Sequence, residues 1–301
     1  MKADLPTSVP AYLERLARAL DSCDPALAQD ALYDAEDYLR SELAANPQKS
    51  EAEVIAAVAG SYGAPDEVAD IYRDTETRVQ TALRPPAPPP RTSLPGRFFG
   101  VLVDPHTYGS LFYMLLALAT GTFYFTWVVT GASLSLGLAI LIIGIPFFIL
   151  FVGATRILAL VEGRIVEVML GERMPRRPLY SDRTQPWLQR IKAMFTDPQT
   201  WGTMLYFLAM LPLGVLYFTL AVVGLSLAMG LIALPLGYWL GFGEHIIVSG
   251  FDIFDPYSPW LWPVSILAGV LVLFTTLHLA RFIGRVHGRI AKKLLVSSQA
   301  Y

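Results

Sequence analysis

The feature that most constrains the fold of this chain is a series of long apolar runs that begins after residue 98. Several of them approach or exceed the roughly 20 residues that a helix needs to cross the hydrocarbon core of a bilayer. Charged residues make up 16% of the chain, whereas soluble domains carry about 25%. The runs therefore predict an integral membrane protein in contact with membrane lipid. They also predict an all-α fold, because a helix pairs its backbone groups within one segment.

Residues 1–80 lack such runs and carry most of the acidic side chains. Their net charge is −9, against +7 for residues 81–301. Pro10 and the capping box from Ser50 to Glu53 mark helix starts in this region. We predict a small cytoplasmic three-helix domain here. Its negative charge argues against direct binding of nucleic acid, whose phosphates attract Lys and Arg.

Composition divides the rest of the chain. Proline at the density seen between residues 84 and 91 forms a stiff, extended spacer. The predicted order is the acidic domain at 1–80, a proline-rich linker at 81–97, a membrane repeat of two spans plus a cytoplasmic segment at 98–192, and a second membrane repeat at 193–301. We predict two spans and a re-entrant or interfacial element in the second repeat.

The membrane part repeats itself. An Asp-Pro-x-Thr-aromatic-Gly motif begins at Asp104 and returns at Asp197, an offset of 93 residues that two later motif pairs share. Arg156 returns as Arg281, an offset of 125, so the second copy holds a net insertion of 32 residues. Copies that begin on the same side of the membrane form an internal parallel repeat. For each Asp-Pro pair we favour a capped helix start over an ion-binding carboxylate.

The placement of Lys and Arg predicts the topology, because basic residues collect on the cytoplasmic side of spans. Both termini and the loop 173–192 are predicted to be cytoplasmic. Segment 243–259 has no Lys or Arg and is predicted to face outward. The first repeat is then a hairpin of spans 109–130 and 132–155 that turns at Gly131.

The second repeat contains three apolar stretches, near 202–222, 226–242 and 260–280. Three crossings would place the basic C-terminal region outside, against the charge rule. We therefore predict that 226–242, which Pro235 interrupts, is the re-entrant or interfacial element. The sequence leaves open whether this segment crosses the membrane.

This inserted region is also the predicted sensory site. A broken helix in a membrane needs cover from protein or from a cavity, and cavities between helices are where ligands bind. The candidate ligand-lining residues are Pro235, Tyr238, Trp239, Phe242 and Trp260. The alternative is that the segment simply plugs the helix bundle.

Chemistry-bearing residues are sparse elsewhere. The central parts of the predicted spans have no charge, and Arg156, Glu162 and Arg164 lie near a helix end, where snorkelling explains them. The histidines, among them His287, are too scattered to predict a metal site. No catalytic or phosphate-binding motif is present, so we expect no enzyme activity and no cofactor.

Asp30, Asp34 and Asp37 share one face of a predicted helix. This acidic face is either a solvated surface or a docking surface for a basic partner.

Two parts of the chain resemble known families. Residues 11–75 resemble the HAAS-type signalling domain, a small bacterial helical module, through Tyr12-Leu13, the acidic helix from Asp30 and the run that begins Gly63-Ala64-Pro65. Residues 96–293 resemble the sensor transmembrane domain of actinobacterial histidine kinases, through the repeated motifs and Gly144-Ile145-Pro146. No kinase core is recognised after this segment.

These resemblances imply a bacterial inner-membrane protein that relays an envelope or lipophilic signal to a cytoplasmic partner. For residues 1–80 they imply a PadR-type or two-component regulator as that partner. Two alternatives remain open at this point. One is a small transporter or channel, favoured by the repeat but disfavoured by the lack of charge within the spans, and the other is a membrane scaffold that senses nothing.

Overall fold

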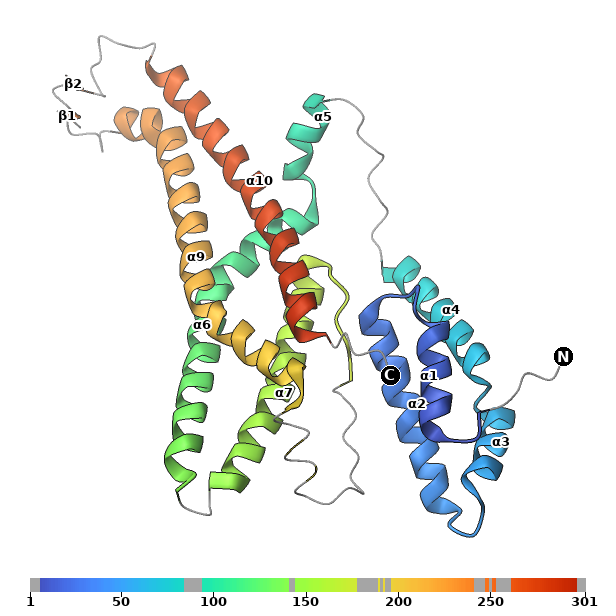
Figure 1. The fold of residues 1–301 in the computed structure, drawn as a ribbon. Helices are drawn as coiled ribbons and strands as arrows, with labels where there is room; N and C mark the ends of the chain where they lie inside the picture. Colours follow the sequence, from blue (N-terminus) through green and yellow to red (C-terminus); the bar gives the residue numbers. More distant parts are fainter. Residues whose placement is uncertain are drawn as a thin grey trace. The chain divides into compact units, whose positions relative to one another are not determined.

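The chain folds into two compact units, each built from separate segments of the sequence. Figure 1 draws the helices and strands with colours that follow the sequence. The computed structural model describes residues 6–83, 94–140, 144–177, 189, 192, 196–240, 247–248, 251–252 and 261–296. The first unit is formed by Met1–Pro89, Val129–Tyr206 and Gly288–Tyr301, and the second by Pro90–Val128 and Phe207–His287. The domain boundaries drawn from composition at residues 80, 97 and 192 stay predictions.

The acidic N-terminal region contains four helices in its described residues, so the prediction of three was wrong. They are α1 (Val9–Ala19), α2 (Pro25–Ala45), α3 (Glu51–Ser61) and α4 (Pro65–Leu83). Pro25 and Pro65 each start a new helix, since proline tolerates the first turn but not the interior. The predicted capping box between Ser50 and Glu53 is present at the start of α3.

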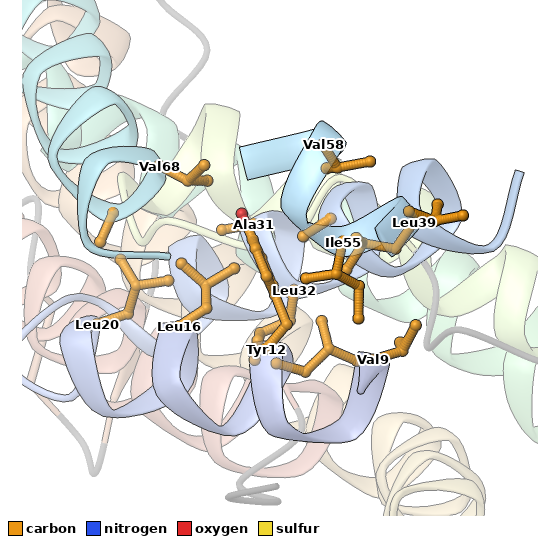
Figure 2. Close-up of a cluster of buried hydrophobic side chains, with 14 residues drawn as sticks. Val9, Tyr12, Leu16, Leu20, Ala31, Leu32, Leu39, Ile55, Val58 and Val68 are labelled. Atoms are coloured by element: carbon orange, nitrogen blue, oxygen red, sulfur yellow. The ribbon is translucent and has the colours of Figure 1, made fainter. Parts of the chain in front are cut away.

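These four helices share one hydrophobic core, shown in Figure 2. Tyr12 and Leu16 are fully buried from α1, and Ile55 is fully buried from α3. The Tyr12 hydroxyl donates a hydrogen bond of 2.7 Å to the carbonyl oxygen of Gly63, and burial raises the pKa of this hydroxyl. Burying a large apolar side chain of this kind stabilises a fold by about 1.5–3 kcal/mol, and all four helices contribute to this core.

The described residues contain four helices that are long and apolar enough to cross a membrane. They are α6 (Pro105–Leu138), α7 (Gly144–Leu170), α9 (Pro198–Trp239) and α10 (Leu261–Leu295). At about 1.5 Å per residue, the 42 residues of α9 are far longer than a hydrocarbon core of about 30 Å. The length and composition of these helices indicate a membrane protein, and α9 is longer than the apolar layer that it would cross.

Short elements complete the second unit. Helix α5 (Leu94–Phe99) leads into a single 3-10 turn, η1 (Gly100–Leu102). Phe98 stacks on Phe274 of α10 with ring centroids 4.7 Å apart, and Val101 is fully buried beside Phe274 and Leu277. Two strands of two residues, β1 (Ile247–Val248) and β2 (Phe251–Asp252), pair antiparallel.

The predicted turn at Gly131 was wrong. Gly131 lies inside α6, which continues to Leu138. A Cβ atom at this position would overlap the ring of Phe151 in α7. The glycine therefore serves close packing between two membrane helices rather than a change of chain direction.

The prediction that residues 226–242 form a separate re-entrant or interfacial element was also wrong. Helix α9 runs without interruption from Pro198 to Trp239 and includes both Pro212 and Pro235. Membrane helices tolerate an internal proline, because neighbouring groups and local adjustment satisfy the freed backbone. Residues 202–222 and 226–239 thus lie in one helix and count as one candidate span, which removes the conflict with the charge rule.

The repeated Asp-Pro motif forms helix caps, as predicted. Asp104 accepts a hydrogen bond from the backbone N–H of His106 at 3.1 Å, directly before α6. Asp197 accepts the equivalent bond from Gln199 at 3.0 Å, directly before α9. The second carboxylate oxygen of each cap binds an arginine of the other copy: Asp104 binds Arg281 at 2.8 Å, and Asp197 binds Arg156 at 2.9 Å.

Two glycines of the second unit bring α6 and α9 into backbone contact. A Cβ atom on Gly121 would lie 2.8 Å from the carbonyl carbon of Met210, and one on Gly214 would lie 2.7 Å from that of Ala117. Gly121 and Gly214 differ by 93 positions, as do Ala117 and Met210. The two contacts are therefore related by the offset of the sequence motifs, with the helices exchanged.

Candidate functional site at the end of helix α7

Residues 171–177, which we call the strap, follow α7 directly. Gly171 has a φ of 77°, a left-handed conformation that glycine adopts easily and that commonly ends helices. Arg164 of α7 donates hydrogen bonds of 2.9 Å to the carbonyl oxygens of Met174 and Pro175. The Met174 side chain is fully buried. The strap is thus held against the helix that it follows.

The strap binds the acidic domain through Asp30 of α2, which is 5% exposed. One carboxylate oxygen of Asp30 accepts the backbone N–H groups of Arg176 at 2.6 Å and of Arg177 at 2.9 Å. The other accepts the Arg173 guanidinium at 3.1 Å. Three donors on one carboxylate fix both the position of the strap and its direction along α2.

Two more ion pairs surround this contact. Arg173 uses its second terminal nitrogen to bind Glu76 of α4 at 2.8 Å, so its guanidinium joins two helices of the acidic domain. Arg177 binds Asp34 of α2 at 3.0 Å. The predicted docking face on α2 is therefore occupied, at Asp30 and Asp34, by basic residues of the same chain. Asp37, the third acidic residue predicted for this face, is exposed.

The charge on Asp30 is held at an energetic cost. Burial raises the pKa of its carboxyl group, and this effect exceeds the lowering by the two backbone N–H groups and by Arg173 and Arg176. A buried ion pair often gains little net free energy over separated, hydrated ions. The contact between the strap and α2 therefore has a smaller net free energy than its number of bonds indicates.

A cavity of about 30 Å³, room for one or two water molecules, lies beside the strap. Its lining combines α2, α7, the strap and the ends of α9 and α10: Gln29, Arg156, Ala159, Leu160, Gly163, Met174, Pro175, Asp197, Gln199, Thr200, Thr203 and Leu295. The amide of Gln199 donates to the carbonyl oxygen of Leu295 at 2.6 Å. Lys292 of α10 binds Asp24, the cap of α2, at 2.5 Å. The strap is therefore surrounded by residues of all these helices.

Glu162 and His287 are buried in the described candidate spans, outside the central segments for which the sequence predicted no charge. Glu162 of α7 is fully buried and accepts the hydroxyl of Tyr206 at 2.9 Å, so snorkelling does not explain it. His287 of α10 is also fully buried, and its ring lies 2.7 Å from the hydroxyl of Tyr113 and 3.3 Å from that of Tyr217.

The offsets of 93 and 125 residues between the sequence motifs also relate these two pairs, so they could have indicated them. Glu162 and His287 differ by 125 positions, and Tyr113 and Tyr206 differ by 93. Each pair thus joins a tyrosine of one copy to an ionisable residue of the other. Within the described residues no group of three His, Cys, Asp or Glu side chains is placed to hold a metal ion.

The predicted ligand-lining residues lie only partly within the described residues. Pro235 is half-buried inside α9, and Trp239 at the end of that helix is 79% exposed. The side chain of Tyr238, and the whole of Phe242 and Trp260, lie outside the described residues. A site formed by these five residues stays a prediction.

Comparison with known proteins identifies the membrane segment. Residues 113–295, more than half of the chain, match the family described as "Putative sensor". No curated protein and no solved structure matches the chain. The match supports the sensor resemblance of residues 96–293, while the HAAS-type resemblance of residues 11–75 stays a prediction. This chain belongs to the "Putative sensor" family.

Proposed function

We propose that this protein is a membrane sensor in which the strap relays a change in the apolar helices to the acidic domain. The family match and the four apolar helices support a sensor in the membrane. The observation that carries the relay is the bonding of Asp30 to three groups of the strap, directly after α7 ends. The signal would be an envelope or lipophilic one, and the protein would act without catalysis or a cofactor.

The geometry explains how such a relay would work. Helix α7 ends at Leu170, and Arg173 is already bound to α2 and α4 three residues later. Because this connection is short, a shift or rotation of α7 would displace the strap and strain its bonds to Asp30. Because burial of Asp30 makes that contact weaker than its number of bonds indicates, a movement of α7 could shift its open and closed populations.

Bilayer thickness provides a direct test. In nanodiscs of short-chain and of long-chain phosphatidylcholine, hydrophobic mismatch should tilt or displace the spans differently. We expect the backbone amides of Arg176 and Arg177, which donate to Asp30, to exchange hydrogen at rates that differ between the two bilayers. The amide of Val54, within the helical start of α3, is the internal control and should not respond. Equal exchange at Arg176 and Arg177 in both bilayers would contradict the relay.

The finer topology is also a proposal: both termini and the loop 173–192 on the cytoplasmic side of the inner membrane, and 243–259 outside. The distribution of Lys and Arg supports it. On a Cys23→Ser background, a cysteine placed at residue 182 should resist an impermeant thiol reagent in intact cells and react after lysis. Labelling in intact cells would show that the loop faces outward.

The internal parallel repeat is proposed together with this topology. Its support is the exchange of partners between copies: each Asp cap binds the arginine of the other copy, and each glycine contact has a counterpart 93 positions away. The cytoplasmic partner, a PadR-type or two-component regulator acting on residues 1–80, rests on the HAAS-type resemblance.

A small transporter or channel is the second candidate. The burial of Glu162 and His287 favours it more than the sequence did, because ionisable groups inside spans often mark ion or proton pathways. Ion flux into liposomes that contain the purified chain would distinguish this function from a sensor. A scaffold without a ligand would show neither flux nor a response to the bilayer.

A further inference from the structure

We propose that the surface formed by Asp30, Asp34 and Glu76 is a docking surface for a partner protein with a bent, arginine-rich segment, and that the strap is its internal competitor. This inference rests on the proposed relay and names the partner chemistry of the same site. The face lies on α2 and α4 and already binds a segment of that kind, which shows what it recognises.

The required partner chemistry follows from the bonds of the strap. One oxygen of Asp30 takes two consecutive backbone N–H groups at the bend of residues 176–177. A bent, non-helical segment can turn successive N–H groups toward one anion, whereas an extended strand points them to opposite sides and a helix interior has them bonded already. Arg173 spans the carboxylates of Asp30 and Glu76 with the two terminal nitrogens of one guanidinium. A lysine has a single terminal nitrogen and lacks this planar fork. The segment therefore needs an arginine three residues before a pair of backbone donors.

The last position of the segment is also specified. Arg177 binds Asp34 through its Nε atom, and its guanidinium carbon lies 5.9 Å from the ring centre of Tyr33. The carbonyl oxygen of Arg177 accepts the amide of Gln29 at 3.0 Å. Arginine combines an ion pair with a cation–π contact, which a partner segment would reproduce. The matching pattern is Arg-x-x-x-Arg, as Arg173 and Arg177 have it.

The strap controls access because it belongs to the same chain. A tethered segment competes at a millimolar effective concentration, so a free partner segment meets a face that is mostly covered. Movement of α7 that withdraws the strap would remove this competition. The face would then become available in proportion to the open fraction.

A labelled peptide with the sequence of residues 171–177 tests the proposal on the full-length chain in detergent. It should bind weakly to the wild type and about tenfold or more tightly to an Arg173→Ala/Arg177→Ala chain, in which the internal competitor is weakened. Adding Asp30→Asn and Asp34→Asn to that chain should remove the gain. A peptide with alanine in place of Arg173 and Arg177 should not bind any variant.

Arg177→Ala alone is the milder second variant, because the Arg177 side chain is 54% exposed and its removal leaves no deeply buried charge unpaired. It should raise peptide affinity by a smaller factor. Protected amides in the core of α1–α4 show that a variant is folded. Equal, weak binding of the peptide to the folded wild type and folded variants would overturn the proposal.

The peptide assay and the nanodisc assay fail separately. If peptide affinity changes among these variants as expected but exchange does not respond to bilayer thickness, the docking surface is supported and the relay is contradicted. If exchange responds to bilayer thickness but the peptide binds no variant, the relay is supported and the docking surface is contradicted.

Discussion

Replacing Gly214 with alanine should destabilise the second unit by about 1–3 kcal/mol, the range for overpacking. The new Cβ would lie 2.7 Å from the carbonyl carbon of Ala117 and overlap its oxygen. These are backbone atoms of a helix and cannot rotate away, so α6 and α9 would have to separate. Gly121→Ala should have a similar effect at Met210. Both effects would appear as a lower midpoint of denaturant unfolding in detergent micelles.

The same two helices supply the controls. A Cβ atom added to Gly137 in α6 or to Gly230 in α9 would meet no neighbouring side chain or helix within 4 Å. Alanine there should be neutral or stabilising by up to about 1 kcal/mol, because alanine favours helix more than glycine does. The Gly121→Ala/Gly214→Ala chain should lose less than the sum of the single losses, since one separation of the helices relieves both overlaps. Equal effects at contact and control glycines would show that α6 and α9 do not touch at Gly121 and Gly214.

Replacing Asp30 with alanine should open the strap, with a loss of about 3–5 kcal/mol from the free energy that holds it closed. The Arg173 side chain is 10% exposed, and without Asp30 its buried charge would lose one of its two carboxylates. The raised pKa of Asp30 is compatible with so large a loss, because removing one partner of a buried ion pair leaves the other charge buried without compensation. Hydrogen exchange at the amides of Arg176 and Arg177 should become more than about a hundredfold faster.

The control for this prediction is Asp74→Ala on α4 of the same domain. The Asp74 side chain is 78% exposed and lies 3.8 Å from Arg78, and exposed pairs of this kind contribute little. In the Asp74→Ala chain, hydrogen exchange at the amides of Arg176 and Arg177 should be as slow as in the wild type. An Asp30→Ala chain with unchanged protection of these two amides would show that Asp30 does not hold the strap. A double-mutant cycle with Arg173→Met should then give a coupling near zero.

Much of the architecture could be predicted from residue patterns. Apolar runs longer than a bilayer core, together with few charges, predicted the membrane helices. Each residue within the apolar layer must itself be compatible with lipid, so this property can be read from the sequence without knowing the fold. Asp104 and Asp197 were predicted as caps because an Asp-Pro pair satisfies the first turn of a helix locally. The acidic face on α2 was predicted because residues three and four apart share one side of a helix.

The errors arose where a residue has different roles in different environments. Gly131 and Pro235 were expected to end helices, as they do in water, but both lie inside membrane helices. In lipid the alternative to a helix is an unpaired backbone, so such residues are retained within spans. Gly131 is needed for contact with Phe151, which no local pattern reveals.

The sequence by itself determined the class of protein, the apolar helices, their caps and the repeated motifs, because each depends on neighbours along the chain. The tertiary structure alone decided which residues meet. It placed Arg173 on Asp30 and Arg177 on Asp34, each 143 residues away along the chain, and it buried Glu162 against Tyr206. Charge and spacing indicate that such groups need partners. Which partner each one takes depends on the packing of whole helices, and no local pattern carries that information.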